Sequence, residues 1–166
     1  MKILFGISGG VAACKSRDVI SALLNHSGKE NLEVHVVCSN SSYHFVTKEI
    51  LQCTATKVWE EDWGSPNHIY ATDDVDMFVI CPATANIIGK IANGLADDFL
   101  SLSSISTANN IPKIMFPAMN TRMINNQAVV DNIARLRTSE FGWKVVDPDV
   151  GDLVCGTTGE GKLPST

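Results

Sequence analysis

Near-continuous apolar runs recur along the chain and are separated by stretches in which apolar and polar residues mix. Unbroken apolar runs of this length are typical of strands that are covered on both faces of a parallel sheet. The runs predict strands over residues 3–7, 32–38, 76–81, 114–116 and 143–146.

Between these runs, apolar residues recur at the spacing of one helical face. This spacing predicts helices over 11–25, 85–107 and 126–141, the second of them broken into two near Asn93-Gly94. Strands that alternate with helices predict an α/β fold with a doubly wound parallel sheet in three layers.

The length of 166 residues indicates one domain. Residues 1–150 contain all the predicted strands and helices and are expected to form the α/β domain that binds a cofactor. Residues 151–166 have no strong periodicity and contain four glycines, so they are predicted to be a mobile flap or tail of the same domain.

Composition excludes several classes of partner. The net charge is −5 and no basic cluster is present, which argues against nucleic acid and against an anionic membrane surface. No apolar stretch is long enough to span a membrane, and the start of the chain does not resemble a signal peptide, so we expect a cytoplasmic protein. The five cysteines form no CxxC pair, so neither a disulfide framework nor a metal site is predicted.

Polar and glycine-rich segments follow the first two predicted strands. Ser8, Gly9 and Gly10 come directly after the first strand, and glycines there allow backbone amides to approach an anion. Residues 39–42, Ser-Asn-Ser-Ser, follow the second strand. Each segment is also explained by a simpler structure, a tight turn in the first case and a helix cap in the second. Because a Walker motif is absent, ATP chemistry is not indicated.

Two further segments, CPATAN at 81–86 and FPAMNTRM at 116–123, end the third and fourth strands. Ligands of open parallel sheets bind beyond the carboxyl ends of the strands, where all four segments meet. Phe45, Pro82, Pro117 and Met119 are apolar and suit the wall of a ring pocket. No acidic residue follows the second strand to bind a ribose, so a flavin mononucleotide (FMN) fits better than a dinucleotide.

These motifs, taken together, resemble those of the homo-oligomeric flavin-containing cysteine decarboxylases. The resemblance extends from Ile3 to Lys162 and keeps the order and spacing of four family motifs. The motifs are Pro82-Ala83-Thr84-Ala85-Asn86, Pro117-Ala118-Met119-Asn120-Thr121-Arg122-Met123, His68 in NHIYATDD, and Cys155 in LVCGTTGEGKLPS. Two positions depart from the family pattern: Thr157 stands where aspartate is common, and Ile124 where an aromatic residue is common.

The resemblance implies a Rossmann-like flavoprotein that binds FMN and assembles as a trimer or as a dodecamer of trimers. The implied cofactor contacts are Ser8, Gly9, Gly10, Ser39, Ser42, Phe45, Pro82, Ala83, Thr84, Asn86 and Met119. The implied catalytic residues are His68 as a base donated across a subunit interface, Asn120 at the substrate carboxylate, and Cys155 in a substrate clamp. Asn120 and Met123 are the implied contacts of the substrate carboxylate region, and Ala118 and Lys162 are further candidate substrate contacts. For Lys162 two interpretations stay open, a solvated surface side chain or a cation that meets a substrate phosphate.

The resemblance also implies a reaction, for which three hypotheses remain open. The first is decarboxylation of 4'-phospho-N-pantothenoylcysteine to 4'-phosphopantetheine in coenzyme A biosynthesis, through a thioaldehyde. The second is oxidative decarboxylation of a peptide C-terminal cysteine to an aminoenethiol. The third is a regulatory subunit that keeps the flavoprotein-like fold and binds a partner without catalysis. Separately, single residues have simpler explanations: Asn86 and Asn120 as helix caps, and Met119 and Met123 as core filler.

Overall fold

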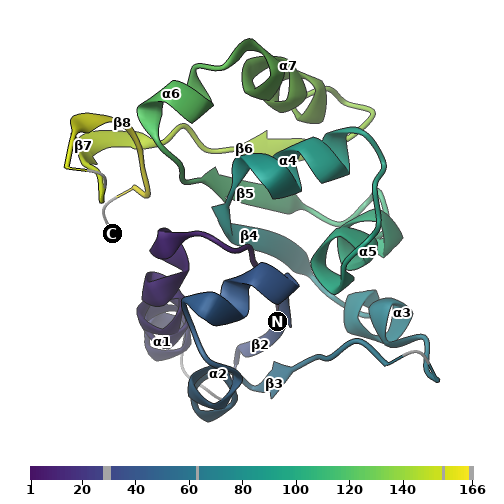
Figure 1. The fold of residues 1–166 in the computed structure, drawn as a ribbon. Helices are drawn as coiled ribbons and strands as arrows, with labels where there is room; N and C mark the ends of the chain where they lie inside the picture. The colour runs from purple at the N-terminus through teal and green to yellow at the C-terminus, as the bar shows by residue number, and fades with distance from the viewer. Residues whose placement is uncertain (28–30, 63, 155, 165–166) are drawn as a thin grey trace.

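A six-stranded parallel sheet forms the centre of the molecule in the computed structural model, which describes residues 1–27, 31–62, 64–154 and 156–164 (Figure 1). The strand order is β3-β2-β1-β4-β5-β6, and every neighbouring pair is parallel. The strands are β1 (Lys2–Ile7), β2 (Glu33–Cys38), β3 (Lys57–Val58), β4 (Met77–Ala83), β5 (Lys113–Pro117) and β6 (Trp143–Val145). The predicted doubly wound α/β fold is therefore confirmed.

Helices cover both faces of this sheet in two groups. On one side α1 packs with α2, and on the other α3, α5, α4 and α7 pack in series. The helical elements are η1 (Val11–Lys15), α1 (Ser16–Ser27), η2 (Asn40–His44), α2 (Lys48–Thr54), α3 (Asn67–Thr72), α4 (Ala85–Ala92), α5 (Phe99–Ser106), α6 (Thr121–Ile124) and α7 (Gln127–Leu136). Successive residues of β1 point to opposite faces, so Leu4 joins one hydrophobic cluster and Phe5 the other.

The predicted elements match the structure closely, with a few informative differences. The break near Asn93-Gly94 is confirmed, since α4 ends at Ala92 and Gly94 has a positive φ of 69°. The first helix begins as a 3-10 turn and becomes α-helical only at Ser16. The short elements β3, α2 and α3 were not predicted. The helices α2 and α3 have only seven and six residues, too few for periodicity to separate a helix from a loop, and β3 has only two residues.

The glycine-rich tail differs most from its prediction. Instead of an irregular flap, β7 (Asp149–Asp152) and β8 (Thr158–Lys162) form an antiparallel hairpin. Its position is fixed by two hydrogen bonds: the Met119 amide donates to the Gly161 carbonyl (3.0 Å) and the Thr121 hydroxyl to the Glu160 carbonyl (2.7 Å). The expected division of the chain at residue 150 falls inside β7.

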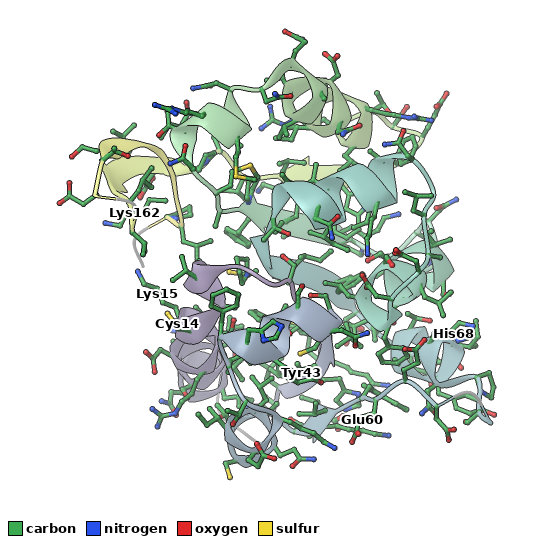
Figure 2. All side chains as sticks on the ribbon, viewed as in Figure 1. Cys14, Lys15, Tyr43, Glu60, His68 and Lys162 are labelled. Carbon is green, nitrogen blue, oxygen red and sulfur yellow. The ribbon has the colours of Figure 1, made fainter. Side chains whose placement is uncertain are left out.

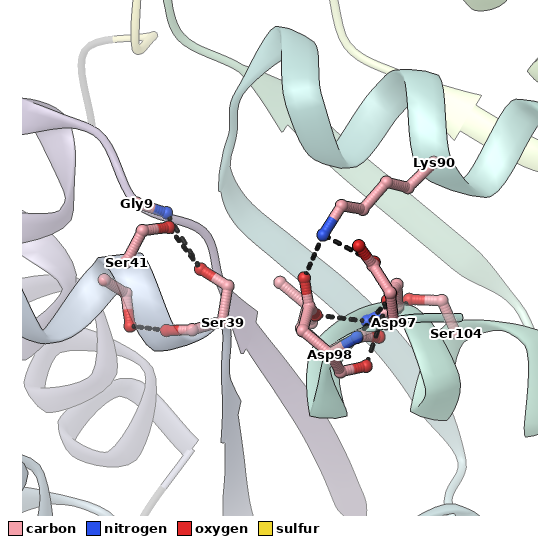
Figure 3. A network of polar contacts seen from close by, with 10 residues as sticks. Gly9, Ser39, Ser41, Lys90, Asp97, Asp98 and Ser104 are labelled. Carbon is pink, nitrogen blue, oxygen red and sulfur yellow. Dashed lines mark hydrogen bonds and ion pairs between the residues drawn. The ribbon is translucent and has the colours of Figure 1, made fainter. Parts of the chain in front are cut away.

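The link between α4 and α5 is held by a partly buried ion-pair network (Figure 3). Lys90 Nζ lies 2.6 Å from Asp97 and 2.5 Å from Asp98. Asp98 also caps α5, because its carboxylate accepts from the Ser101 amide at 2.9 Å. The network thus connects α4 to the start of α5, and the first turn of α4 reaches the site described below.

Within the described ranges, no helix is both long and apolar enough to cross a membrane. The same residues contain no group of three or more histidine, cysteine or acidic side chains arranged to hold a metal ion.

Candidate functional site

A cavity of about 530 Å³ opens at the carboxyl edge of the sheet. Its walls come from four places: η1, the first turn of α4, the segment after β5, and the β7–β8 hairpin. Most lining side chains are glycine, alanine, valine, leucine or methionine, and a few are polar or charged. A mostly apolar cavity of this size with a few convergent polar groups is typical of cofactor and substrate sites.

The structure brings together most residues of the motifs at strand ends. Those that line the cavity are Gly9, Gly10, Thr84, Asn86, Ala118, Met119, Asn120, Met123 and Lys162. They follow the ends of β1, β4 and β5 or, for Lys162, end β8, and they are up to 153 positions apart in sequence, the difference between 162 and 9. The predicted convergence at one edge of the sheet is therefore present in the fold.

Ser8 does not line this cavity. It is buried, and its hydroxyl donates to the Pro82 carbonyl (2.8 Å) while accepting from the Thr84 amide (2.9 Å). These two bonds join the end of β1 to the end of β4. Pro82 and Ala83 are likewise buried behind the cavity wall and do not line it. The structure thus places these three residues as supports of the site.

The side chains of Ser39 and Ser42 also form hydrogen bonds with backbone groups of the neighbouring loops. The Gly9 amide donates to the Ser39 hydroxyl at 3.1 Å (Figure 3), and the Ser42 hydroxyl donates to the Ser39 carbonyl at 2.8 Å. A Cβ added at Gly9 would lie 2.6 Å from the Ser41 carbonyl carbon, so only glycine fits there. Phe45 is 42% exposed and lies outside the cavity lining.

Asn120 and the two methionines occupy the wall formed after β5. The Asn120 side-chain oxygen accepts from the Arg122 amide at 2.8 Å and caps α6, so the capping interpretation is confirmed for this residue. That bond commits the oxygen to the helix and fixes which way the amide group is turned. Met123 is 46% exposed at the cavity, so it is not core filler. Met119 is half-buried, lines the cavity and also packs against the hydrophobic core, so the core interpretation holds in part for this residue.

His68 lies far from this cavity in its own chain. It sits on α3, which packs against α5, whereas the cavity residues Cys14, Lys15 and Lys162 lie at the opposite side of the molecule (Figure 2). A role for His68 at this site therefore requires a second copy of the chain. Cys155, the other predicted catalytic side chain besides Asn120, lies outside the described residues.

The sequence did not single out several lining residues. Val11, Ala12, Cys14 and Lys15 belong to η1, directly after the glycine turn, and their proximity to Gly10 was the available signal. Asp152, Leu153, Val154 and Leu163 come from the hairpin and its flank, where no periodicity pointed to a wall. The η1 residues could have been found from their position directly after the glycine turn. The hairpin residues reach the cavity only because the hairpin docks beside it.

A second cavity of about 500 Å³ lies beside the end of β2, between Tyr43, Trp59 and Phe99. Cys38 on its wall is buried, and this burial raises the pKa of the thiol to about 11 against smaller opposing effects of hydrogen bonds from Ser42 and Tyr43. Burial likewise raises the pKa of Cys81 to about 12. Both thiols stay protonated near neutrality and are poor nucleophiles.

The residues of the first cavity suit a flat phosphorylated cofactor such as FMN. Small residues at positions 10, 85 and 118 leave space for close approach of a ring or a phosphate. A Cβ at Gly10 would come within 3.0 Å of Thr84 Cγ2, so a larger residue would narrow the cavity. The site and fold together define a class of protein, an α/β protein with a ligand site at the carboxyl edge of a parallel sheet.

Comparison with known proteins identifies the family. The family model described as Flavoprotein matches residues 1–166, so the chain belongs to the Flavoprotein family, a family of FMN-binding proteins. The chain is 33% identical over 168 residues to a probable phosphopantothenoylcysteine decarboxylase from Streptococcus mutans, covering 98% of this chain and 90% of the relative. It is 34% identical to the coenzyme A biosynthesis bifunctional protein CoaBC of Bacillus subtilis, of which it covers 39%.

Solved structures agree with this relationship. A PPC decarboxylase complexed with pantothenoylaminoethenethiol matches with a TM-score of 0.84 and 31% identity, covering 99% of this chain and 91% of the other. The peptidyl-cysteine decarboxylase EpiD matches with a TM-score of 0.77 and 28% identity, covering 89% and 86%. The chain is thus homologous to FMN-dependent cysteine decarboxylases of both substrate types.

Proposed function

We propose that this chain is an FMN-dependent enzyme that decarboxylates the cysteine moiety of 4'-phospho-N-pantothenoylcysteine to give 4'-phosphopantetheine. The observation that carries the proposal is the pairing of two walls in one cavity. The segment 118–123 forms one wall and the β7–β8 hairpin forms the adjacent wall, and the two are hydrogen-bonded through Met119 and Thr121. The similarity to PPC decarboxylases over nearly the whole chain supports the same substrate.

The residues around the cavity have distinct parts in this proposal. The capped Asn120 presents its side-chain amide as the donor to the substrate carboxylate, and Met123 contacts the adjoining carbons. Ala118 leaves space beside them for the cysteine moiety. Bound FMN would supply the two-electron redox chemistry that a cysteine carboxylate needs before it can lose CO₂.

The walls also control access of water. Leu153, Val154 and Leu163 bring apolar side chains from the hairpin and its flank to the cavity. Excluding water strengthens the polar interactions that orient a carboxylate, and it protects reactive intermediates. Cys155 follows Val154 directly and is proposed as the proton donor of the late step.

The base that removes the substrate thiol proton is proposed to be His68 of a second copy. A histidine suits this task near neutral pH, and its position away from its own cavity requires an intersubunit site. We therefore propose a homo-oligomer, a trimer or a dodecamer of trimers, in which α3 of one chain faces the cavity of the next.

A peptide with a C-terminal cysteine is the second candidate substrate. It is favoured by the match to EpiD, including a structure of EpiD complexed with a substrate peptide at 25% identity and a TM-score of 0.84. The third hypothesis, a regulatory subunit without catalysis, has no specific observation in its favour. It leaves unexplained why the segments 84–86 and 118–123, which belong to two of the four motifs, meet at one cavity.

The test is to purify the protein, record its visible spectrum and identify products by mass after adding each substrate. Loss of CO₂ alone from phosphopantothenoylcysteine is the expected result. Loss of CO₂ with two hydrogens from a cysteine-ended peptide would replace the first hypothesis with the second. A protein that binds no FMN, or that turns over neither substrate, would contradict both.

Two variants separate the proposed roles of the side chains. His68→Asn should abolish turnover while the protein keeps its yellow colour, because the histidine acts on the thiol and does not anchor the flavin. Cys155→Ser should leave oxidation and decarboxylation intact and cause an oxidised enethiol product to accumulate. Wild-type product formation by either variant would contradict the role assigned to it.

A further inference from the structure

Few charged side chains line the cavity, and more of them are basic than acidic. They are Lys15, Asp152 and Lys162. Asp152 accepts a hydrogen bond from the Thr158 hydroxyl at 2.7 Å within the hairpin. Among the residues that the structure describes, neither lysine forms an ion pair. The cavity therefore carries two ammonium groups without an acidic partner.

The two lysines belong to different walls at the same side of the molecule. Lys15 ends η1 and is exposed, whereas Lys162 ends β8 and is half-buried (Figure 2). The Lys162 side chain lies along the hairpin, since a Cβ built at Gly151 would be 2.9 Å from its Cδ and 3.3 Å from its Nζ. This packing limits the positions of the Lys162 ammonium group.

We propose that Lys15 and Lys162 together bind the phosphomonoester of the substrate and so select the phosphorylated small molecule over a peptide. The proposal rests on the proposed function and names the part of the substrate that each wall recognises. Ammonium groups bind phosphate as point charges, and a phosphate dianion has the charge to match two of them. A peptide that ends in cysteine has its carboxylate at the reacting end and need not carry a second anion.

The placement of the other polar groups favours the substrate over FMN as the source of this phosphate. Gly9 and Gly10 follow the end of β1, next to Thr84 at the start of α4. Lys162 comes from the hairpin, which is hydrogen-bonded to the segment 118–123 that carries Asn120. A substrate whose carboxylate meets Asn120 would extend along the hairpin toward the lysines.

The experiment compares phosphopantothenoylcysteine with pantothenoylcysteine, which lacks the phosphate. Lys15→Gln, Lys162→Gln and the double variant are prepared as holoproteins, with Lys144→Gln as the matched control. Lys144 is an exposed lysine on β6 that does not line the cavity. The measured quantity is the ratio of kcat/KM for the two substrates.

Each cavity variant should lower this preference for the phosphorylated substrate about tenfold, through KM, because one charge-assisted contact with the phosphate is lost. A tenfold change corresponds to about 1.4 kcal/mol. The control should keep the wild-type preference. An unchanged preference in the double variant, or an equal loss on both substrates, would overturn the proposal.

Two binding measurements make the result independent of turnover. Calorimetry with 4'-phosphopantetheine and pantetheine should show the same loss of phosphate preference in the double variant. Titration of the apoprotein with FMN and riboflavin should show a preference for FMN that the variants retain. If the variants lose that preference instead, the lysines bind the cofactor phosphate and the proposal is wrong. A wild-type protein inactive on both substrates would refute the proposed function, whereas calorimetry would still decide the role of the lysines.

Discussion

At the scale of single residues, the predicted location of Ser8 is correct, but its hydroxyl binds backbone groups and does not line the cavity. Its position after β1 predicted a contact with the cofactor, and it does lie at the edge of the sheet where the cavity opens. Its hydroxyl is already engaged, however, by the Pro82 carbonyl and the Thr84 amide. The residue joins two strand ends, and the cavity wall depends on it indirectly.

Replacing Ser8 with alanine separates these two roles. If the hydroxyl supports the fold, Ser8→Ala should lower the free energy of unfolding of the apoprotein by about 1–3 kcal/mol. The Thr84 amide loses its acceptor, and the Pro82 carbonyl keeps only the Ser8 backbone amide, at 3.3 Å. Urea unfolding of the apoprotein measures this loss, and Ser106→Ala, on the far part of α5, is a suitable comparison. An apoprotein of unchanged stability with much weaker FMN affinity would instead indicate direct contact with the cofactor.

At the scale of elements, the β7–β8 hairpin is the feature that the chain pattern predicted least well. Residues 151–166 have no apolar periodicity, and the hairpin is held by contacts with the segment after β5. Its glycines have a definite purpose: Gly161 has a φ of 127°, and a Cβ there would lie 3.1 Å from the Met119 carbonyl carbon and closer still to its oxygen. Two backbones can approach this closely only where one has no side chain.

Gly161→Ala should therefore release the hairpin from the segment 119–121. Strain of this kind costs about 1–3 kcal/mol, so the fraction of molecules with an undocked hairpin should rise about tenfold or more. Limited proteolysis with mass identification of cleavage sites within 149–162 measures this fraction. Gly89→Ala is the control, because a Cβ there meets its nearest neighbour at 3.6 Å. Equal cleavage of the two variants would show that Gly161 is not required for docking.

At the scale of the whole molecule, one chain holds the parts of a site but does not assemble them. Asn120 and the hairpin meet at one cavity, while α3 carries His68 on another side (Figure 2). In a closed symmetric oligomer each chain can give one part to its neighbour and receive the other part in return. The proposed activity would then belong to the assembly.

Mixing two inactive variants tests this arrangement. His68→Asn and Asn120→Asp are each expected to be inactive alone. After joint unfolding and reassembly, roughly a quarter of the sites would pair an intact histidine from one chain with an intact asparagine from another. Recovered turnover near this fraction, measured by product mass, is the expected result. As a control, each variant is reassembled alone, and a mixture as inactive as these controls would place both residues in one chain's site.

Much of the architecture follows from the sequence, because the core strands are apolar on both faces and the helices between them are amphipathic. These local patterns determined the parallel sheet, the break at Asn93-Gly94 and the meeting of three strand-end segments at one cavity. The fourth segment, 39–42, does not line the cavity and is joined to the first through the bond from the Gly9 amide to Ser39. Connections in parallel sheets leave few alternatives, so strand ends could be placed together without coordinates.

The tertiary structure decided what depends on contacts between distant segments. It placed Lys15 and Lys162 on one cavity, turned Ser8 and Ser39 toward backbone groups, and docked the hairpin on Met119. It also separated His68 from the cavity of its own chain. The sequence by itself determined which residues stand at strand ends, since periodicity is local. Which side chains face a ligand and which bind backbone was decided by packing, because it depends on how close distant segments come.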